Sequence, residues 1–205
     1  MNAPQGSTAW LSARAGHATA SRFKDVLARI KVGEAAGRRN YRMQLVTERL
    51  TCIPCESYTN AAMQWGTDTE PAARAAYEAL TGEIVAEAPF LLHTGLDWVG
   101  ASPDGLVGAD GGIEIKCPHQ STVHVETLQG GMPPDHIAQI QGVMWVTGRQ
   151  WVDFVSFDPR MPENLQLHVE RIKRDEPYIT LLETEVRKFL AEVDALEQQL
   201  RKRVA

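Results

Sequence analysis

The chain has 205 residues, of which 43% are hydrophobic and 23% are charged, and its formal net charge is −5. This ordinary globular composition argues against a mainly disordered chain, because there is enough apolar surface to offset the entropy lost on folding. No apolar run approaches the length needed to span a bilayer, which argues against a membrane protein.

The N-terminal third is expected to be mostly helical. A first helix is predicted after a cap at Thr19 or Ser21, with apolar residues at helical spacing up to Ile30. A glycine-containing loop is predicted over residues 31–39. A second helix is predicted over residues 41–50.

The segment TCIPCESYT ends the second helix, because Pro54 cannot continue it. An alanine-rich helical segment over residues 60–80 follows. We expect this segment to be interrupted near Gly66 and Pro71 and to end at Gly82.

The hydrophobic period then changes from helical to alternating. Short strands separated by Gly, Asp and Pro turns are predicted over residues 83–92, 98–102 and 112–117. A helix over 135–147, strands over 151–157 and 165–172, and a long amphipathic helix over 175–203 complete the chain. In that last helix, the residues predicted to face inward are Leu181, Leu182, Phe189, Val193 and Leu196. This order predicts an α/β (α+β) fold with a central mixed sheet flanked by helices.

No internal repeat, low-complexity tract or long linker divides the chain. We therefore expect a single domain over residues 1–205. Its predicted parts are a helical N-terminal region over about 9–81, a core sheet over about 83–173 and a C-terminal helix over about 175–203.

The charges are unevenly distributed. Residues 1–49 hold nine Lys and Arg against three Asp and Glu, whereas residues 50–118 hold two against ten. A cationic surface for a polyanion beside metal-binding carboxylates would produce this asymmetry. A solvated helical surface that happens to be basic would produce it equally well, so charge alone leaves both interpretations open.

The region with the most candidate catalytic residues is SPDG at residues 102–105 followed by GIEIKCP at 112–118. Side chains two apart in a strand share a face, so Glu114 and Lys116 lie side by side. The opposite, apolar face is formed by Ile113, Ile115 and Cys117. If the strand before the SPDG turn pairs with the GIEIK strand, Asp104 and Glu114 converge.

Two converging carboxylates suit Mg²⁺, which prefers oxygen ligands, and the backbone carbonyl of Ile115 offers another oxygen. Such a site can hydrolyse a phosphodiester: one metal generates a hydroxide nucleophile and a second stabilises the leaving oxygen. A neighbouring lysine can orient or deprotonate the water. The alternative is a surface Glu–Lys ion pair after an Asp turn, which is the more common meaning of this short pattern alone.

Further motifs occur in order along the chain. They are Ala9-Trp10-x-x-x-Arg14-x-Gly16-x-x-Thr19-Ala20-Ser21, Trp65-Gly66-x-x-x-Glu70, the two segments above, Ala138-Gln139-Ile140-Gln141, Trp145-Val146-Thr147 and Asp158-Pro159-Arg160-Met161. With this run, the chain resembles the lambda-exonuclease-like (YqaJ viral recombinase) branch of the PD-(D/E)-x-K nuclease superfamily. It departs from the family in a short leader before Trp10 and between Pro118 and Gln139.

The resemblance implies a restriction-endonuclease-like core, usually assembled as a ring-shaped homotrimer. It implies Mg²⁺-dependent 5′→3′ digestion of one strand of linear duplex DNA to 5′-mononucleotides, with two metal ions in each active site and Mn²⁺ as an alternative. The 3′ overhangs would serve phage-type homologous recombination in the cytoplasm of a bacterial host. A single-strand annealing protein is the implied partner.

The resemblance also implies roles for single residues. Asp104 and Glu114, with the Ile115 carbonyl, correspond to metal ligands, and Lys116 to the residue that positions or activates the water. Glu70 corresponds to an additional acid near the second metal.

Gln139 would bind the attacking water or the metal shell from a neighbouring helix. Arg14, Ser21 and Ser102 match a small cationic pocket for a 5′-phosphate. A guanidinium fork and two hydroxyls suit a terminal phosphate dianion.

Two other functions remain open. The first is another nuclease of the same superfamily, such as an endonuclease or a junction resolvase. The second is a DNA-end-binding recombination module that has lost catalysis, although the intact set of acids and lysine argues against it. A protein unrelated to nucleic acids would require the motif run to be coincidental.

The three cysteines form no even-numbered disulfide framework, and the first residues, MNAPQGSTAW, lack the pattern of a secretory signal. We therefore expect a reducing, cytoplasmic location. Cys52, Cys55, Cys117 and His119 offer too few ligands, too far apart, for a convincing zinc or iron–sulfur site. Cys117 is expected in the core, and the role of the other two cysteines is left open. Trp145 and Trp151 are expected in the core or in subunit contacts.

Overall fold

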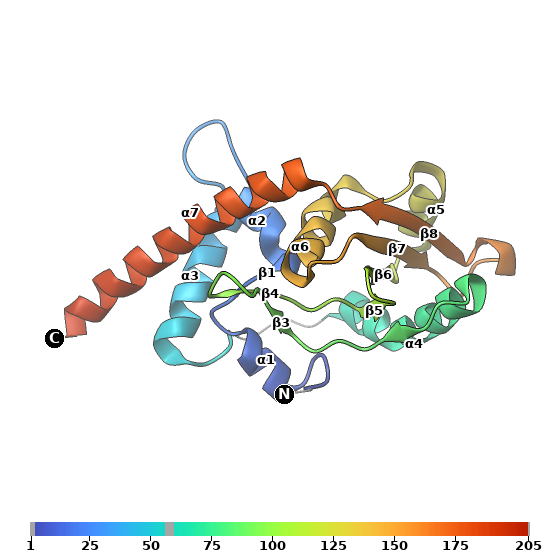
Figure 1. Ribbon diagram of the computed structural model, residues 1–205, viewed down its shortest axis with the longest axis horizontal. Helices are drawn as coiled ribbons and strands as arrows, with labels where there is room; N and C mark the ends of the chain where they lie inside the picture. Colours follow the sequence, from blue (N-terminus) through green and yellow to red (C-terminus); the bar gives the residue numbers. More distant parts are fainter. Residues whose placement is uncertain (1–2, 56–59, 205) are drawn as a thin grey trace.

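The computed structural model describes residues 3–55 and 60–204, and Figure 1 shows helices packed around mixed β-structure. The N-terminal part contains α1 (Thr8–Arg14), β1 (Ala18–Thr19), α2 (Phe23–Leu27), α3 (Ala36–Thr51) and α4 (Ala61–Thr81). Next come β2 (Val85–Ala86), β3 (Leu91–Leu92), β4 (Val99–Ala101), β5 (Gly105–Val107) and β6 (Gly111–Lys116). The C-terminal part contains α5 (Ser121–Gly130), α6 (Ile137–Thr147), β7 (Trp151–Phe157), β8 (Leu167–Lys173) and α7 (Glu176–Arg201).

The strands form two sheets rather than the one central sheet that the sequence predicts. A five-stranded sheet has the order β2-β5-β6-β7-β8, and a three-stranded sheet has the order β1-β4-β3. The pairs β6–β7 and β1–β4 are parallel, whereas the others are antiparallel. The predicted mixed α/β architecture with flanking helices is confirmed.

The five-stranded sheet is covered on both faces, which explains why β7 is buried along most of its length. Val155 and Phe157 pack in a cluster with α4, to which Ala73 and Tyr77 belong. The alternate residue Phe154 belongs to a second, larger cluster on the opposite face. On that face lie α5 and α6.

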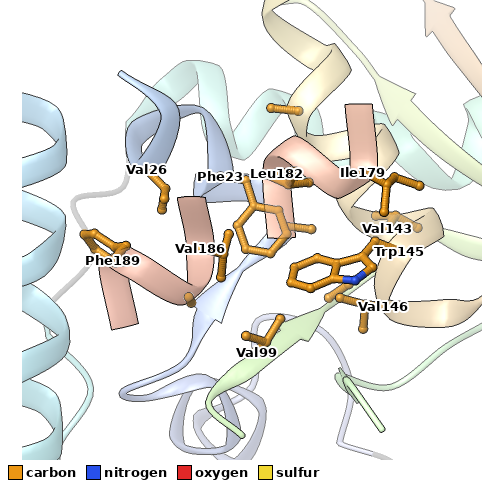
Figure 2. Close-up of a cluster of buried hydrophobic side chains, with 14 of the residues drawn as sticks. Phe23, Val26, Val99, Val143, Trp145, Val146, Ile179, Leu182, Val186 and Phe189 are labelled. Carbon is orange, nitrogen blue, oxygen red and sulfur yellow. The ribbon is translucent and has the colours of Figure 1, made fainter. Parts of the chain in front are cut away.

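The larger cluster is centred on α6, and Figure 2 shows it between α2, α7 and the smaller sheet. Helix α6 is buried on nearly every side, as expected for a helix without a polar face. Helix α7 contributes Leu182, Val186 and Phe189 to this cluster, all of them fully buried. Leu181, which we predicted to face inward, is instead 55% exposed, because the buried stripe runs through its neighbour Leu182.

Helix α4 is continuous, so the predicted interruption near Gly66 and Pro71 is wrong. Pro71 lies inside the helix and removes one backbone hydrogen bond. Burial of Thr69, Ala73 and Tyr77 against the sheet offsets that loss. The helix ends at Gly82 in a left-handed conformation, as predicted.

The strand predicted over residues 83–92 is two separate strands. Val85–Ala86 belongs to the five-stranded sheet and Leu91–Leu92 to the three-stranded one. Pro89 lies between them and cannot donate a ladder hydrogen bond. Likewise, the strand before the SPDG turn pairs with β1 and β3 and not with β6, so that predicted pairing is wrong.

The N-terminal helices have other boundaries than predicted. Helix α2 ends at Leu27 and leaves Ile30 56% exposed, and Thr19 makes no side-chain cap. Helix α3 begins at Ala36, inside the predicted loop. It ends at Thr51, with Cys52 as its C-cap, before Pro54. The rest of the predicted break includes residues 56–59, which lie outside the described part of the chain.

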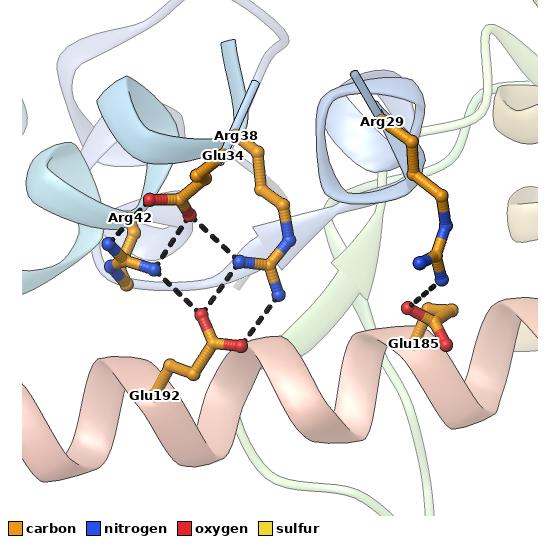
Figure 3. A network of polar contacts seen from close by, with 6 residues as sticks. All are labelled: Arg29, Glu34, Arg38, Arg42, Glu185 and Glu192. Atoms are coloured by element: carbon orange, nitrogen blue, oxygen red, sulfur yellow. Dashed lines mark hydrogen bonds and ion pairs between the residues drawn. The ribbon is translucent and has the colours of Figure 1, made fainter. Parts of the chain in front are cut away.

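Within the described residues, five of the nine basic residues of positions 1–49 form ion pairs, four of them with acids of α7. Figure 3 shows Arg38 and Arg42 both bridging Glu34 to Glu192 of α7, with N–O distances of 2.7–2.8 Å. Further pairs are Arg29–Glu185, Arg22–Asp25 and Arg49–Asp194. Much of the positive charge is therefore neutralised within the fold. These residues are therefore ion-paired and do not form a freely solvated basic surface, and Arg14 has a different environment.

None of the helices that the structure describes has an apolar stretch long enough to traverse a bilayer.

Candidate active site

One cleft of about 480 Å³ brings together every residue that the sequence singled out for catalysis or phosphate binding. They are Arg14, Ser21, Glu70, Ser102, Asp104, Glu114, Ile115, Lys116 and Gln139. The cleft lies where the two sheets approach each other, because Ser102 directly follows β4 and Asp104 directly precedes β5. Residues far apart in the sequence thus share one surface.

Asp104 and Glu114 do converge, although through a strand that the sequence analysis missed. Strand β5 pairs antiparallel with β6 and places Gly105 opposite Ile113, so the next pair in that register is Asp104 and Glu114. Because β5 begins only at Gly105, the N–H of Ile115 has no strand partner and donates instead to Asp104 Oδ2 at 2.7 Å. This bond fixes the Asp104 side chain at the edge of the sheet.

Glu114 is the most buried acid of the cleft, at 1% exposure. Its Oε1 accepts hydrogen bonds from Lys116 Nζ and, at 2.5 Å, from Gln139 Nε2 of α6. Its Oε2 is buried and has no hydrogen-bond partner among the described residues. Burial, with the repulsion of Asp104, outweighs the attraction of Lys116 and raises the pKa of Glu114 to about 7.

Lys116 shares a face with Glu114, as the strand alternation predicts, while Ile113 and Ile115 pack with α4 on the other face. Burial lowers the pKa of Lys116, but the carboxylates of Glu114 and Asp104 outweigh this effect and raise it. The ammonium form is therefore stabilised within the cleft.

Glu70 approaches the same acids from α4. Burial and the charge of Asp104 raise its pKa, against the opposing effect of Arg74. Its Oε1 accepts a hydrogen bond of 2.9 Å from Arg74 Nη2. Three carboxylates thus influence one another in one cleft.

The opposite end of the cleft is cationic. Arg14 donates to Ser102 Oγ at 2.8 Å, to Ser21 Oγ at 3.3 Å and to Thr19 Oγ1 at 3.4 Å. Its guanidinium lies over the ring of Trp10, 4.2 Å from the centroid. Burial lowers the pKa of Arg14, and no carboxylate within the described residues forms an ion pair with it. A partly desolvated cation surrounded by hydroxyls is a site for an anion.

Comparison with known proteins identifies the family. The sequence model of the YqaJ-like viral recombinase domain matches residues 9–150. The chain belongs to the YqaJ-like viral recombinase family.

Solved structures agree with this family. Two crystal structures of LHK-Exo, an alkaline exonuclease from Laribacter hongkongensis, are 47% identical in sequence, cover 97% of this chain and 98% of their own, and superpose with TM-scores of 0.90 and 0.88. The first of them is a complex with dAMP. A phage-related exonuclease from Haemophilus somnus 129PT, 14% identical over 92% of this chain and 96% of its own, has the same fold with a TM-score of 0.66. No protein among the curated sequences matches the chain.

These likenesses establish the PD-(D/E)xK fold of the YqaJ-like chain and support a nuclease role of exonuclease type. The roles of the single cleft residues are not decided by the likenesses and stay predictions. The geometry does show that the nine residues line one cleft.

The DPRM motif, to which the resemblance gave no role, supports the acidic end of the cleft. Arg160 binds both carboxylate oxygens of Asp158 at 2.8 Å and donates to the carbonyls of Pro118 and His119 at 3.1 and 2.9 Å. Its guanidinium lies over Trp65, 4.4 Å from the ring centroid. One side chain therefore joins the end of β6, which carries Lys116, to the first turns of α4.

The segment that carries Arg14, Thr19 and Ser21 is held by α3, a support that the sequence did not predict. Gly16, at φ +75°, donates its N–H to Glu48 Oε2 at 2.7 Å, and its carbonyl accepts from Arg49 Nε at 3.0 Å. The N–H of Thr19 donates to the hydroxyl of Tyr41 at 2.9 Å. Only the glycine within the first motif indicated this turn, because its partners lie 22 to 33 residues later in the sequence.

The donor set suits a hard divalent cation. Glu114 presents a buried carboxylate oxygen without a partner among the described residues, next to the Asp104 carboxylate. The N–H and C=O of one strand residue point to the same side, so the Ile115 carbonyl faces Asp104 too. Within the described residues no cluster of three or more His, Cys, Asp and Glu side chains is close enough to hold an ion alone. Backbone oxygen and water would complete the shell, as Mg²⁺ prefers.

The cysteines lie in different places. Cys52 and Cys55 follow the end of α3, where the N–H of Cys55 donates to Glu48 Oε1 at 3.1 Å. Cys117 packs against the smaller hydrophobic cluster, as predicted, and Trp145 lies in the larger one. Trp151 is partly buried against the smaller cluster.

Proposed function

We propose that this chain is a Mg²⁺-dependent 5′→3′ exonuclease that degrades one strand of linear duplex DNA to 5′-mononucleotides. The observation that carries the proposal is the single cleft with an acidic end and a cationic end. A terminal nucleotide has a phosphate at its 5′ side and a phosphodiester at its 3′ side, so one such cleft can bind the first and hydrolyse the second. The dAMP bound to LHK-Exo is a 5′-mononucleotide, which supports this product class.

Asp104, Glu114 and the Ile115 carbonyl would hold the metal, with Glu70 serving a second ion. The bound metal would lower the pKa of a water molecule and neutralise charge on the phosphate. Mn²⁺ shares the preference for oxygen ligands and is a plausible substitute.

Lys116 and Gln139 would contribute hydrogen-bond donors to the reaction. Both donate to the same oxygen of Glu114, which holds the two side chains side by side. With a metal held by the acids, these two donors would be placed to orient the attacking water and to face the developing negative charge on the phosphate. The ammonium form of Lys116, stabilised by its acidic neighbours, suits the second task.

Arg14, with Ser21 and Ser102, would bind the terminal 5′-phosphate. Arg14 already donates to both hydroxyls, so the three groups are held within reach of one anion before DNA arrives. Reading a terminal phosphate gives the enzyme its polarity, since each cleavage produces a new 5′-phosphate for the same site.

The family membership supports a place in phage-type homologous recombination in the cytoplasm of a bacterial host. There, the exposed 3′ strand would pass to a single-strand annealing protein. We also propose that three chains form a ring around the duplex, because a closed ring would keep the DNA threaded during successive cleavages.

The test is digestion of linear duplex DNA labelled at either the 5′ or the 3′ end, with and without Mg²⁺. We expect metal-dependent release of a labelled mononucleotide from the 5′ end at once, and of the 3′ label only late. Covalently closed circular DNA should stay intact. Cleavage of the circle would indicate an endonuclease or resolvase, and DNA-end binding without cleavage at any metal concentration would indicate a catalytically silent module.

A further inference from the structure

Arg74 contacts two of the acidic segments of the cleft through one nitrogen atom. Its Nη2 donates to Glu70 Oε1 at 2.9 Å and to the main-chain carbonyl of Asp104 at 3.1 Å. Glu70 lies one turn earlier on α4, whereas Asp104 lies at the start of β5, 30 residues away in sequence. Arg74 is therefore the direct hydrogen-bonded link between the helix and the turn.

An ordinary helix-surface pair does not explain this geometry. Glu and Arg four residues apart on an exposed helix contribute only a few tenths of a kcal/mol, roughly 0.2–0.5. Here the two side chains are only 27% and 22% exposed, and the Nε of Arg74 is buried without a partner among the described residues. Its remaining ion pair, with Glu87 at 3.3 Å, is to a side chain that is 87% exposed. The guanidinium is thus held mainly by the two cleft segments.

The contacts of Arg74 leave at least one carboxylate oxygen of each acid available to a ligand. Arg74 uses Oε1 of Glu70, and Oε2 accepts no hydrogen bond from the residues that the structure describes. At Asp104 it uses the backbone carbonyl and leaves the carboxylate, whose Oδ2 is bound by Ile115 N–H. A residue that fixes two metal ligands without occupying their free oxygens serves to position them.

We propose that Arg74 is a positioning residue that sets the separation of Glu70 and Asp104 and thereby the metal affinity of the cleft. The inference rests on the proposed function insofar as that function assigns these two acids to metal. It adds a residue that neither the motifs nor the family resemblance marks.

Two effects of removing Arg74 oppose each other, and the test must separate them. Loss of a cation beside carboxylates strengthens metal binding through electrostatics. Loss of the bridge lets α4 and the Asp104 turn move apart and weakens metal binding, by on the order of 10-fold or more for residues that orient ligands. We expect the second effect to be larger, because both acceptors depend on the same nitrogen.

The experiment measures Mn²⁺ binding to the DNA-free protein by electron paramagnetic resonance, in parallel with the Mg²⁺ concentration that gives half-maximal DNA digestion. The variants are Arg74→Lys, which keeps the charge but not the planar fork, and Arg74→Gln, which removes the charge. Both should weaken Mn²⁺ binding, Arg74→Gln by on the order of 10-fold, and both should leave the preference for 5′-phosphorylated ends unchanged.

Arg149→Gln is the matched control. Arg149 caps the other end of the same β5–β6 hairpin, where it donates to the carbonyls of Gly108 and Gly111 at 2.7 and 3.2 Å. Its loss should lower the melting temperature without changing Mn²⁺ affinity.

Three outcomes would overturn the proposal. Tighter Mn²⁺ binding in Arg74→Gln with no change in Arg74→Lys would show that only charge matters. Equal weakening in Arg149→Gln would show a general effect of hairpin stability. Unchanged binding in both Arg74 variants would show no role. Because metal binding is measured without DNA, a failure of the proposed exonuclease activity would appear separately, as wild-type protein that binds Mn²⁺ but digests nothing.

Discussion

The two ends of the cleft are built in different ways and have opposite electrostatic character. The acidic end lies on the five-stranded sheet, with Glu114 and Lys116 fixed by a regular strand and Asp104 by a bond to the backbone of that strand. The cationic end lies on short strands and turns, with Arg14 at the end of α1 and its loop held by side chains of α3.

This difference indicates which kind of ligand suits each end of the cleft. At the acidic end, negative charge is crowded and one oxygen of Glu114 has no partner within the described chain. At the cationic end, a partly desolvated guanidinium has hydroxyls around it and no ion-paired carboxylate among the described residues. Under the proposed function, a divalent cation would complete the first and a phosphate dianion the second, so the two ends should respond independently to mutation.

Removing Lys116 should produce the largest effect and should affect only the acidic end. Lys116→Ala removes the ammonium that we propose faces the developing charge, and we expect DNA digestion to fall by about 100- to 1,000-fold. Binding of 5′-phosphorylated DNA ends, measured by fluorescence anisotropy in Ca²⁺, should stay within about twofold of wild type. An active Lys116→Ala enzyme would remove the lysine from the mechanism.

Removing Arg14 should affect only the cationic end. A charge-assisted hydrogen bond contributes roughly 1.5–3 kcal/mol, so Arg14→Ala should slow digestion of 5′-phosphorylated DNA by about 10- to 100-fold. Digestion of 5′-hydroxyl DNA should change little, and calorimetric Mn²⁺ affinity should not change. Equal rates on the two DNAs in the wild-type enzyme would refute the phosphate pocket.

The pKa of Glu114 predicts a pH dependence that the cationic end should lack. Because the folded metal-free protein has this pKa at about 7, the carboxyl is mostly protonated at pH 6 and ionised at pH 8. A metal must displace the proton below pH 7, so calorimetric Mn²⁺ affinity should be about 10-fold weaker at pH 6 than at pH 8. Affinity for 5′-phosphorylated ends should not follow this curve.

The same raised pKa has a consequence for stability. Between about pH 4.5 and pH 7, the folded protein binds more protons at Glu114 than the unfolded chain does. The free energy of unfolding of the metal-free protein should therefore fall as the pH rises through this window. Urea unfolding of Glu114→Gln should lack this component of the pH dependence, and an unaltered pH dependence in the variant would contradict the assignment.

The smallest effect is expected from the turn at Gly16. A Cβ there would lie 2.8 Å from Cγ of Arg49 and 3.2 Å from Trp98, in a backbone conformation that favours glycine. Gly16→Ala should reduce the discrimination between 5′-phosphate and 5′-hydroxyl ends by a few-fold without affecting Mn²⁺ binding. Gly82→Ala is the control, since Gly82 has a similar φ of +72° and open space around it. Its melting temperature should fall while its discrimination stays intact.

The sequence predicted the parts of the fold that have a long hydrophobic period. Strands β6 and β7, helix α6 and helix α7 carry patterns of six or more residues, and they appear where expected. The two-residue strands β1, β2 and β3 carry no such pattern, which is why the second sheet was not predicted. The predicted interruption at Pro71 is wrong because local helix propensity does not show that α4 packs along the sheet.

The candidate site was predicted in its residues and not in its supports. The acids, the lysine and the hydroxyls of Ser21 and Ser102 lie in recognisable motifs, and all of them line the cleft. Their supports are Arg74, Arg160 and Glu48, whose partners are up to 42 residues away in the sequence. A contact of that kind leaves no local signal in a single sequence.

The SPDG turn has one further consequence. Ser102, which accepts a hydrogen bond from Arg14, and Asp104, which is bound to Ile115, are separated by Pro103 alone. Two residues span at most about 7 Å, and the proline ring restricts the torsion between them. With the proposed roles, the chain itself acts as a rigid spacer between the group that recognises a strand terminus and the group that serves its hydrolysis. The length of the DNA fragment released in each cleavage would then be set by residues 102–104. It would not depend on the sequence of the DNA.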